Sequence, residues 1–299
     1  MTKKSKISLL IAVVILLTTA LIITLHLLTK KPEPLIPEKT EVTEDTYKEE
    51  PSEINPQIIG FSVESRKIEN YNYGHGSTTL LFVGGIHGGY EWNSVLLAYS
   101  FIDKIESGEI KIPEEITIKI IPNLNPDGVY KVTNKEGRFD PTDVEADYKN
   151  GEGRFNANEV DLNRNFACKW QPTSTWKNKN VSAGKTAFSE PEAKALKEFV
   201  EKEKPSAVIF WHSQANAVYA SECEKGILPN TIKLMDTYAK ASGYKAISAF
   251  DAYPVTGDAE GWLASIGIPA ITVELSSRES IDWIKNKAGV EAVLELYSK

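Results

Sequence analysis

The chain has 299 residues, of which 41% are hydrophobic and 25% charged, and its formal net charge is −7. This acidic balance gives no support for a nucleic-acid partner, because binding to phosphates requires an excess of basic residues. The two cysteines, Cys168 and Cys223, are too few and too far apart for a zinc site built from cysteine alone.

The first thirty residues predict a membrane anchor. Residues 7–28 contain no Asp, Glu, Lys or Arg, and a helix rising about 1.5 Å per residue over this length crosses a hydrocarbon core of roughly 30 Å. Lys3, Lys4 and Lys6 precede the run, which favours an N-terminus inside and the rest of the chain outside the cytoplasm. A cleaved signal peptide, leaving a secreted protein, is the alternative, but its apolar region usually has only about 7–15 residues.

Residues 31–55 predict an extended tether, since they hold four prolines and eight acidic residues against three lysines. Such a composition cannot bury enough apolar surface to offset the entropy lost on ordering. The length of the remainder, residues 56–299, suits one catalytic α/β domain with a sizeable core.

Short apolar runs alternate with longer amphipathic segments after residue 56. We expect strands at 78–84, 115–122, 207–211 and 270–275, and helices at 91–106, 189–204, 228–242, 258–265 and 289–298. Ser189 and Glu192 predict a capping box at the start of the second helix. This alternation predicts a mostly parallel sheet covered on both faces, with ligands beyond the carboxyl ends of its strands.

Residues capable of metal chemistry follow these strands. His87 and His212 each come directly after a predicted strand, Glu91 follows His87 by four residues, and Glu274 lies at the end of a strand. A lone histidine after a strand is more often structural than a ligand, and we expect His75, in its glycine-rich turn, to be a surface loop residue. Two histidines with nearby glutamates instead indicate the His₂Glu set with which catalytic zinc sites bind the metal and keep one position for water.

The motifs around these residues resemble those of the zinc carboxypeptidase family, the M14 peptidases typified by carboxypeptidase A. The landmarks occur in the family's order as NPDG at 125–128, VDLNRNF at 160–166, FSEPE at 188–192 and TVEL at 272–275. The resemblance covers about residues 56–299. It implies a three-layer α/β/α fold with a central mixed, mostly parallel sheet of about eight strands, and one catalytic Zn²⁺ per chain.

The resemblance implies that His87, Glu91 and His212 bind the zinc. The family usually spaces its first two ligands as His-x-x-Glu, whereas this chain has one residue more between them. Gly88 and Gly89 are flexible enough to absorb the additional residue. The alternative for Glu91 is that it merely opens the following helix, where the helix dipole favours an acid.

The resemblance also implies four substrate-binding or catalytic positions. Asn163 and Arg164 would hold the terminal carboxylate of the substrate, since a guanidinium suits bidentate carboxylate binding. Arg154 would stabilise the oxyanion, with Arg138 as the competing candidate. Tyr253 would cover the bound substrate.

Glu274 corresponds to the family's general base, which takes a proton from the attacking water and delivers it to the leaving amine. Glu260 lies seven residues after Tyr253, at a position that lines the family's specificity pocket. With Asp258 nearby, it predicts a preference for a basic group or an amine on the released residue. The alternative is that both acids occupy the exposed first turn of the helix that leads to Trp262, which we expect to pack in the core.

We therefore expect a membrane-anchored, extracytoplasmic zinc metallocarboxypeptidase that acts on a peptide or peptidoglycan peptide with a free carboxylate. The nearest alternative is an amidase that cuts cell-wall peptides next to a diamino acid. An acyl-amino-acid hydrolase such as a desuccinylase and a non-catalytic peptide-binding module are further alternatives. Outside the cytoplasm Cys168 and Cys223 would form a disulfide, with two buried thiols as the alternative. The natural substrate and the oligomeric state stay open.

Overall fold

The computed structural model describes residues 17–19, 24 and 56–299, without the side chains of residues 146 and 147. The predicted membrane helix at 7–28, apart from residues 17–19 and 24, and the predicted tether at 31–55 lie outside the described residues. Among the described residues, no helix has both the length and the apolar character that crossing a membrane requires.

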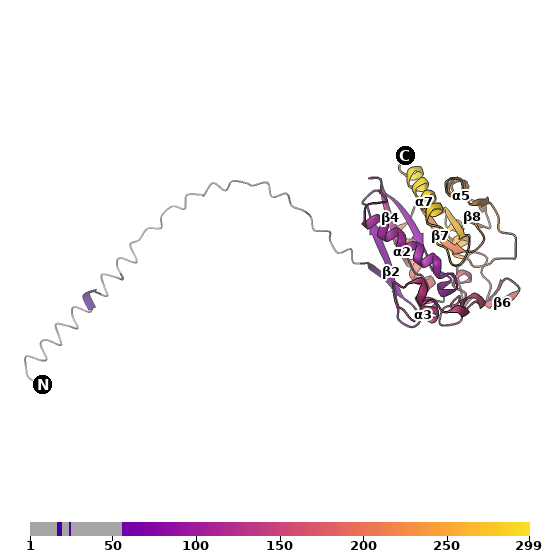
Figure 1. The fold of residues 1–299 in the computed structure, drawn as a ribbon, viewed down its shortest axis with the longest axis horizontal. Helices are drawn as coiled ribbons and strands as arrows, with labels where there is room; N and C mark the ends of the chain where they lie inside the picture. The colour runs from indigo at the N-terminus through magenta and orange to yellow at the C-terminus, as the bar shows by residue number, and fades with distance from the viewer. Residues whose placement is uncertain (1–16, 20–23, 25–55) are drawn as a thin grey trace, which may run out of the picture. The chain divides into compact units, whose positions relative to one another are not determined.

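An eight-stranded mixed sheet lies at the centre of the unit formed by Glu53–Lys299 (Figure 1). In spatial order its strands are β1 (Gln57–Phe61), β2 (Lys67–Tyr73), β4 (Ile116–Ile121), β3 (Thr78–Val83), β7 (Ala207–Ser213), β12 (Ala270–Leu275), β8 (Ala217–Ala220) and β11 (Lys245–Ile247). The four strands β4, β3, β7 and β12 run parallel, as do β8 and β11. The pairs β1–β2, β2–β4 and β12–β8 are antiparallel. The expected α/β fold with a mixed sheet of about eight strands is confirmed.

Helices pack against both faces of this sheet. One face carries α2 (Trp92–Glu106), α3 (Pro126–Thr133), α5 (Pro229–Ser242) and α7 (Trp283–Tyr297), and the other carries α4 (Pro191–Glu203) and α6 (Ala259–Ser265). In Figure 1, α2 and α7 lie on the near side of the sheet. The smaller elements are η1 (Gly88–Glu91), η2 (Pro141–Asp143), η3 (Ala146–Asn150), η4 (Leu162–Arg164), β5 (Thr173–Trp176), β6 (Lys179–Ser182), β9 (Glu222–Cys223) and β10 (Gly226–Ile227).

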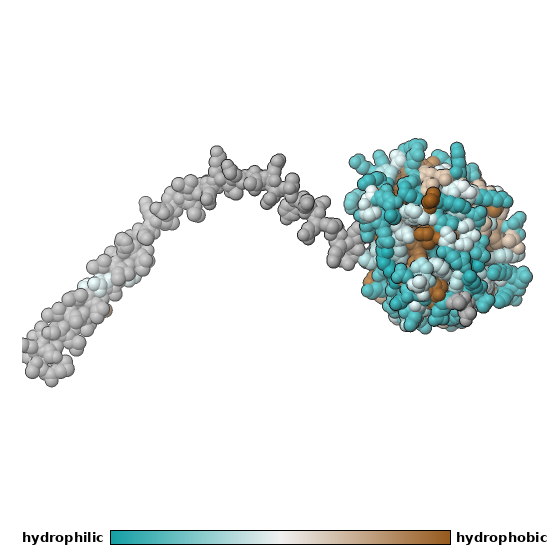
Figure 2. All heavy atoms as spheres, in the orientation of Figure 1, coloured by the Kyte–Doolittle hydropathy of each residue, from teal (hydrophilic) through white to brown (hydrophobic). Residues whose placement is uncertain are grey.

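The central strands are continuous apolar runs because both of their faces are buried. In β3, Leu80 and Phe82 pack in the cluster that contains α2, α5 and α7, whereas Leu81 and Val83 pack in the cluster that contains α4 and α6. All four side chains are at most 1% exposed. In Figure 2 the visible face of this unit is mostly hydrophilic, with small separate hydrophobic patches.

The structure corrects two predicted helix starts. The capping box at Ser189 is wrong, because the N-cap of α4 is Glu190 and makes no side-chain capping bond. The Ser189 hydroxyl instead donates to Glu190 Oε1, and Glu192 Oε1 accepts a bond from the Val63 amide. The last helix, α7, begins at Trp283 rather than at residue 289.

Candidate metal centre and substrate cavity

Two parallel strands place a histidine beside a glutamate. β7 and β12 pair in a register that sets His212 opposite Glu274. β3 pairs with the other edge of β7, also in parallel, so the segment after β3 leaves the sheet at the same end. His87 and Glu91 belong to that segment. The carboxyl ends of three adjacent strands therefore bring these four residues to one edge of the sheet.

The segment between His87 and Glu91 is a single turn of 3₁₀ helix that only glycines can form here. Gly88 has a φ of +43°, and a Cβ atom on it would lie 2.6 Å from the carbonyl oxygen of Gly153. A Cβ atom on Gly89 would lie 2.2 Å from the side chain of Val132. The two glycines thus accommodate the longer spacing between the first two candidate ligands.

His87, Glu91 and His212 form a group that can hold a metal ion. One ligand atom from each residue lies within 4.8 Å of the others, and each residue is at most 4% exposed. His212 Nδ1 lies 3.1 Å from Glu91 Oε2, near the spacing of about 3.4 Å between ligand atoms in tetrahedral zinc sites. His87 Nδ1 is buried and has no hydrogen-bond partner among the described residues. This donor set, two imidazoles and a carboxylate, fits zinc.

The neighbours of these ligands set their protonation. Burial, followed by the charge of Arg154, lowers the pKa of His87 well below its usual value, so its imidazole is neutral and able to bind a metal. Burial alone would raise the pKa of Glu91, but its hydrogen bond to His212 and the charges of His212 and Arg154 lower it. Burial alone would lower the pKa of His212, but its bonds to Glu260 and Glu91 raise it to about 10. A bound cation displaces that proton.

Glu274 has the protonation behaviour expected of a general base. Burial, followed by the negative charge of Glu91, raises the pKa of Glu274 to about 7, and a cation bound at Glu91 would lower it again. With a cation bound the carboxyl is therefore ionised near neutral pH, which is the form that accepts a proton.

A cavity of about 660 Å³ opens at this edge of the sheet. All the site residues predicted from the sequence line it: His87, Glu91, Arg154, Asn163, Arg164, His212, Tyr253, Glu260 and Glu274. Arg138, the competitor of Arg154, does not line this cavity and instead pairs with Asp103 at 2.8 Å. Location therefore favours Arg154, while the roles of the residues remain predictions.

Arg154 is held by a carboxylate that the sequence analysis left without a role. Its Nε and Nη2 atoms donate to Asp161 Oδ2 at 3.0 and 2.9 Å. The other oxygen of Asp161 lies 3.6 Å from His87 Nδ1, and Arg154 Nη1 lies 3.8 Å from Glu91 Oε1. Asp161 belongs to the VDLNRNF run, but only the folded chain places it between an arginine and a candidate metal ligand.

Arg164 has no acidic partner among the described residues. Its guanidinium donates to the backbone carbonyl oxygens of Thr175 and Asn163. The Asn163 side chain accepts a bond from the Ala259 amide through Oδ1 at 2.8 Å, which leaves its NH₂ group as a donor. A positive charge and an amide donor thus stand together in the cavity, as the binding of a carboxylate requires.

Glu260 is buried, at 3% exposure. The alternative that it occupies an exposed first turn is therefore wrong. Its Oε1 atom lies 3.1 Å from His212 Nε2 and accepts a bond from the Thr272 hydroxyl. The neighbouring Asp258 caps α6 by accepting a bond from the Gly261 amide. Glu260 thus contacts a candidate metal ligand, while its role in specificity remains a prediction.

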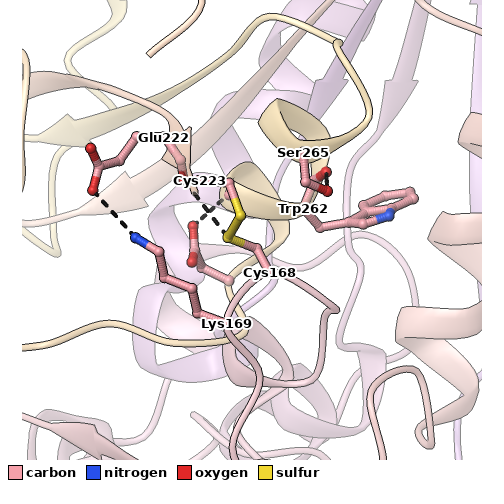
Figure 3. Close-up of a disulfide and its surroundings, with 8 residues drawn as sticks. Cys168, Lys169, Glu222, Cys223, Trp262 and Ser265 are labelled. Atoms are coloured by element: carbon pink, nitrogen blue, oxygen red, sulfur yellow. Dashed lines mark hydrogen bonds and ion pairs between the residues drawn. A yellow bond between two sulfur atoms is a disulfide. The ribbon is translucent and has the colours of Figure 1, made fainter. Parts of the chain in front are cut away.

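The expected packing of Trp262 is confirmed, as its ring stacks on Phe166 at 5.7 Å and is 3% exposed. The predicted disulfide between Cys168 and Cys223 is present, with Cα atoms 6.1 Å apart (Figure 3). The sequence analysis missed Tyr90 and Arg278, which also line the cavity. Their closeness in the sequence to Glu91 and Glu274 is the only signal that pointed to them.

Comparison with known proteins places these features in a family. The sequence profile of the zinc carboxypeptidase family, Peptidase_M14, matches residues 40–296. One curated relative is γ-D-glutamyl-L-diamino acid endopeptidase 1 of Lysinibacillus sphaericus, 25% identical over 73% of this chain and 60% of the relative. Another is zinc carboxypeptidase A 1 of Anopheles gambiae, 29% identical over 72% of this chain and 52% of the relative. The chain thus spans about half to three-fifths of these relatives.

Solved structures share the fold at lower sequence identity. The murein-tripeptide amidase MpaA of Escherichia coli O157 has a TM-score of 0.60 and 20% identity, over 82% of this chain and 92% of that protein. Bovine thrombin-activatable fibrinolysis inhibitor has a TM-score of 0.63 and 21% identity, over 83% of this chain and 89% of that chain. Because the matched profile is that of zinc enzymes and the buried group of His87, Glu91 and His212 fits the ion, zinc is the cofactor.

Proposed function

This chain belongs to the zinc carboxypeptidase family, and we propose that it is a metallocarboxypeptidase that hydrolyses the amide bond next to a free C-terminal carboxylate. The observation that carries the proposal is the placement of Arg164. Among the described residues its guanidinium donates hydrogen bonds only to backbone carbonyl oxygens, and it shares one cavity with Glu274 and the metal-ligand group. A substrate carboxylate would supply the missing negative partner.

In this proposal each residue of the site has a separate role in the reaction. Arg164 and the amide of Asn163 hold the terminal carboxylate and so position the scissile bond. His87, Glu91 and His212 would hold the zinc, which when bound would act as a Lewis acid on the scissile carbonyl and lower the pKa of water. Glu274 takes the proton of the attacking water and transfers it to the amide nitrogen, so that the C–N bond breaks with an amine as leaving group. Arg154 faces the oxygen that gains negative charge.

A pair of peptides tests this function. One ends in a free carboxylate, and the other has the same sequence with a C-terminal amide. We expect the zinc-loaded full-length protein to favour the free acid by about 10²-fold or more in kcat/KM, because the amide leaves the buried guanidinium without its charged partner. Glu274→Gln serves as the inactive control, and mass spectrometry identifies the bond cut. Equal cleavage of the two peptides would exclude a carboxypeptidase.

A cell-wall peptide amidase is the second candidate. Glu260 and Asp258 line the cavity, and their carboxylates could pair with the side-chain amine of a diamino acid. A relative named as an endopeptidase for γ-D-glutamyl-L-diamino acid bonds agrees with this possibility. Comparing L-Ala-γ-D-Glu-diaminopimelate with α-linked peptides ending in Lys or Phe separates the candidates, because only the amidase prefers the γ-linked bond.

We also propose that the catalytic domain acts outside the cytoplasm, attached through residues 7–28. The disulfide between Cys168 and Cys223 supports this location, because such bonds persist in oxidising compartments. Fractionation of cells that produce the tagged protein, followed by protease treatment of intact cells, tests both parts. Protection of the catalytic domain from the protease would contradict the proposal.

A further inference from the structure

Arg278 is a cation of the cavity without an acidic partner. Its Nη2 atom donates to the hydroxyl of Tyr90 at 2.6 Å, and its guanidinium carbon lies 4.1 Å from the centre of the Tyr90 ring. Its Nε atom is buried without a hydrogen-bond partner, and it forms no ion pair with any residue that the structure describes. The adjacent Glu279 is engaged elsewhere, with Tyr148 and Lys149. Arg278 therefore keeps an unused donor and has no direct ion pair among the described residues, although its charge acts on the nearby carboxyl of Glu274.

Lys177 approaches the same ring. Its ammonium lies 5.1 Å from the centre of the Trp176 ring and 5.8 Å from that of Tyr90. Its side chain lines the cavity, and it pairs with no acid whose side chain the structure describes. Arg154 is also near this ring, at 5.6 Å, but Asp161 compensates its charge. We call Tyr90, Lys177 and Arg278 the cationic corner. It combines two positive charges that form no ion pair with the described side chains and a ring that holds the guanidinium in place.

The other cations of the cavity are already accounted for. Lys169 pairs with Glu222 at 3.8 Å, as Figure 3 shows. Arg164 is the receptor of the terminal carboxylate in the function proposed above. The cationic corner is therefore an additional site of positive charge, built from η1, from the segment after β5 and from the segment after β12.

We propose that the cationic corner binds a second carboxylate, carried by the substrate residue on the acyl side of the scissile bond. This proposal rests on the proposed function, because it names the substrate class of the same site. Arg164 holds the residue that is released. Arg278 follows the general base Glu274 by four residues and contacts Tyr90, the residue before the ligand Glu91. Arg154, which faces the scissile carbonyl oxygen in the proposed function, lies 5.6 Å from the centre of the Tyr90 ring. We therefore assign the cationic corner to the residue that contributes this carbonyl.

Two kinds of peptide have the required chemistry. In a γ-linked glutamyl peptide the side-chain carboxyl forms the scissile amide, so the α-carboxylate of the same residue is free. In an α-linked glutamyl peptide the α-carboxyl forms the amide and the side-chain carboxylate is free. Either anion would satisfy the guanidinium with charge-assisted hydrogen bonds.

Two matched pairs of peptides test the proposal. One compares L-Ala-γ-D-Glu-diaminopimelate with its isoglutamine form, in which an amide replaces the α-carboxylate. The other compares N-acetyl-Glu-Lys with N-acetyl-Gln-Lys. In the zinc-loaded full-length protein we expect the acid to exceed the amide by about tenfold in kcat/KM within the pair that is cut. Arg278→Gln should reduce that ratio to about one, and Arg278→Lys should restore part of it.

Lys169→Met is the matched control, because it removes a cavity cation that already has an acidic partner. It should leave the ratio of acid to amide unchanged. Circular dichroism and thermal unfolding establish that each variant is folded. A ratio that stays the same in Arg278→Gln, or that falls equally in Lys169→Met, overturns the cationic corner.

Binding measurements separate this proposal from the proposed function. Calorimetry with the Glu274→Gln protein gives the affinity for each intact peptide without turnover. We expect tighter binding of the acid by about tenfold, and loss of that difference when Arg278→Gln is added. If no peptide is cut but the difference in affinity is found, the proposed function fails and the corner stands. If the peptides bind equally, or neither binds, the corner is refuted whatever the turnover.

Discussion

The disulfide between Cys168 and Cys223 should stabilise both the fold and the substrate side of the cavity. It closes a loop across a sequence separation of 55 residues. In the chain-entropy model, a cross-link over this length lowers the entropy of the unfolded chain enough to add about 4 kcal/mol to the free energy of unfolding at 25 °C. Replacing both cysteines with serine should therefore lower the free energy of unfolding by about 3–4 kcal/mol.

The bridge also anchors the segment that carries Arg164. The backbone carbonyl of Cys168 accepts a bond from the Gly257 amide at 2.7 Å, and the Gly257 carbonyl accepts one from Phe166. Loss of the cross-link loosens this segment, so we expect KM to rise several-fold. The zinc affinity should stay unchanged, because His212 lies in the central strand β7 and does not depend on the bridge.

Guanidinium unfolding of the full-length protein measures the first effect, and steady-state kinetics with a zinc titration measure the second. Reduced wild-type protein is the matched control, since it keeps both sulfur atoms in the core and removes only the cross-link. A loss below about 1 kcal/mol in both the reduced and the serine proteins would refute the entropic argument. An unchanged KM would show that the segment holds its shape without the bridge.

Three further predictions concern single side chains. His87→Ala and His212→Ala should abolish stoichiometric zinc by atomic absorption, and wild-type zinc affinity in Glu91→Ala would show that another residue is the third ligand. Glu274→Gln should keep zinc but retain less than about a tenth of kcat. Burial raises the pKa of Glu192 from 4.5 to about 7, against the hydrogen bonds from Asn156 and the Val63 amide that lower it. Its stabilising contribution is present below pH 4.5 and lost as the pH rises through about 7, so the free energy of unfolding of Glu192→Gln should vary less over this range.

The central strands of the sheet could be predicted from the sequence, but the outer strands could not. The strands β3, β4, β7 and β12 are continuous apolar runs because helices cover both of their faces, and burial of this kind leaves a direct mark on composition. The outer strands β1, β2, β8 and β11 were not predicted. They are short or partly exposed, so their patterns differ little from those of loops.

The residues of the candidate site could likewise be predicted only in part. Residues at the ends of central strands, such as His212 and Glu274, could be predicted because register alone sets them side by side. Contacts between segments that lie far apart in the chain could not be predicted. The bond between Arg154 and Asp161 and the approach of Arg278 to Tyr90 depend on how loops pack over the edge of the sheet, and no local period records that packing.

Two roles are predicted for Glu260. Its position in the family motif predicts that it sets substrate specificity, and its contact with His212 predicts that it supports a metal ligand. Its carboxylate lies 3.1 Å from His212 Nε2, and such partners orient metal-binding imidazoles and raise their basicity. Glu260→Gln keeps the shape and one acceptor but removes the charge. We expect zinc affinity, measured by competition with a chelator, to fall about tenfold. The preference for peptides ending in Lys over those ending in Phe should fall with it if the same charge also meets the substrate. An unchanged zinc affinity would refute the supporting role, and a Lys preference that survives the substitution would refute the role in specificity.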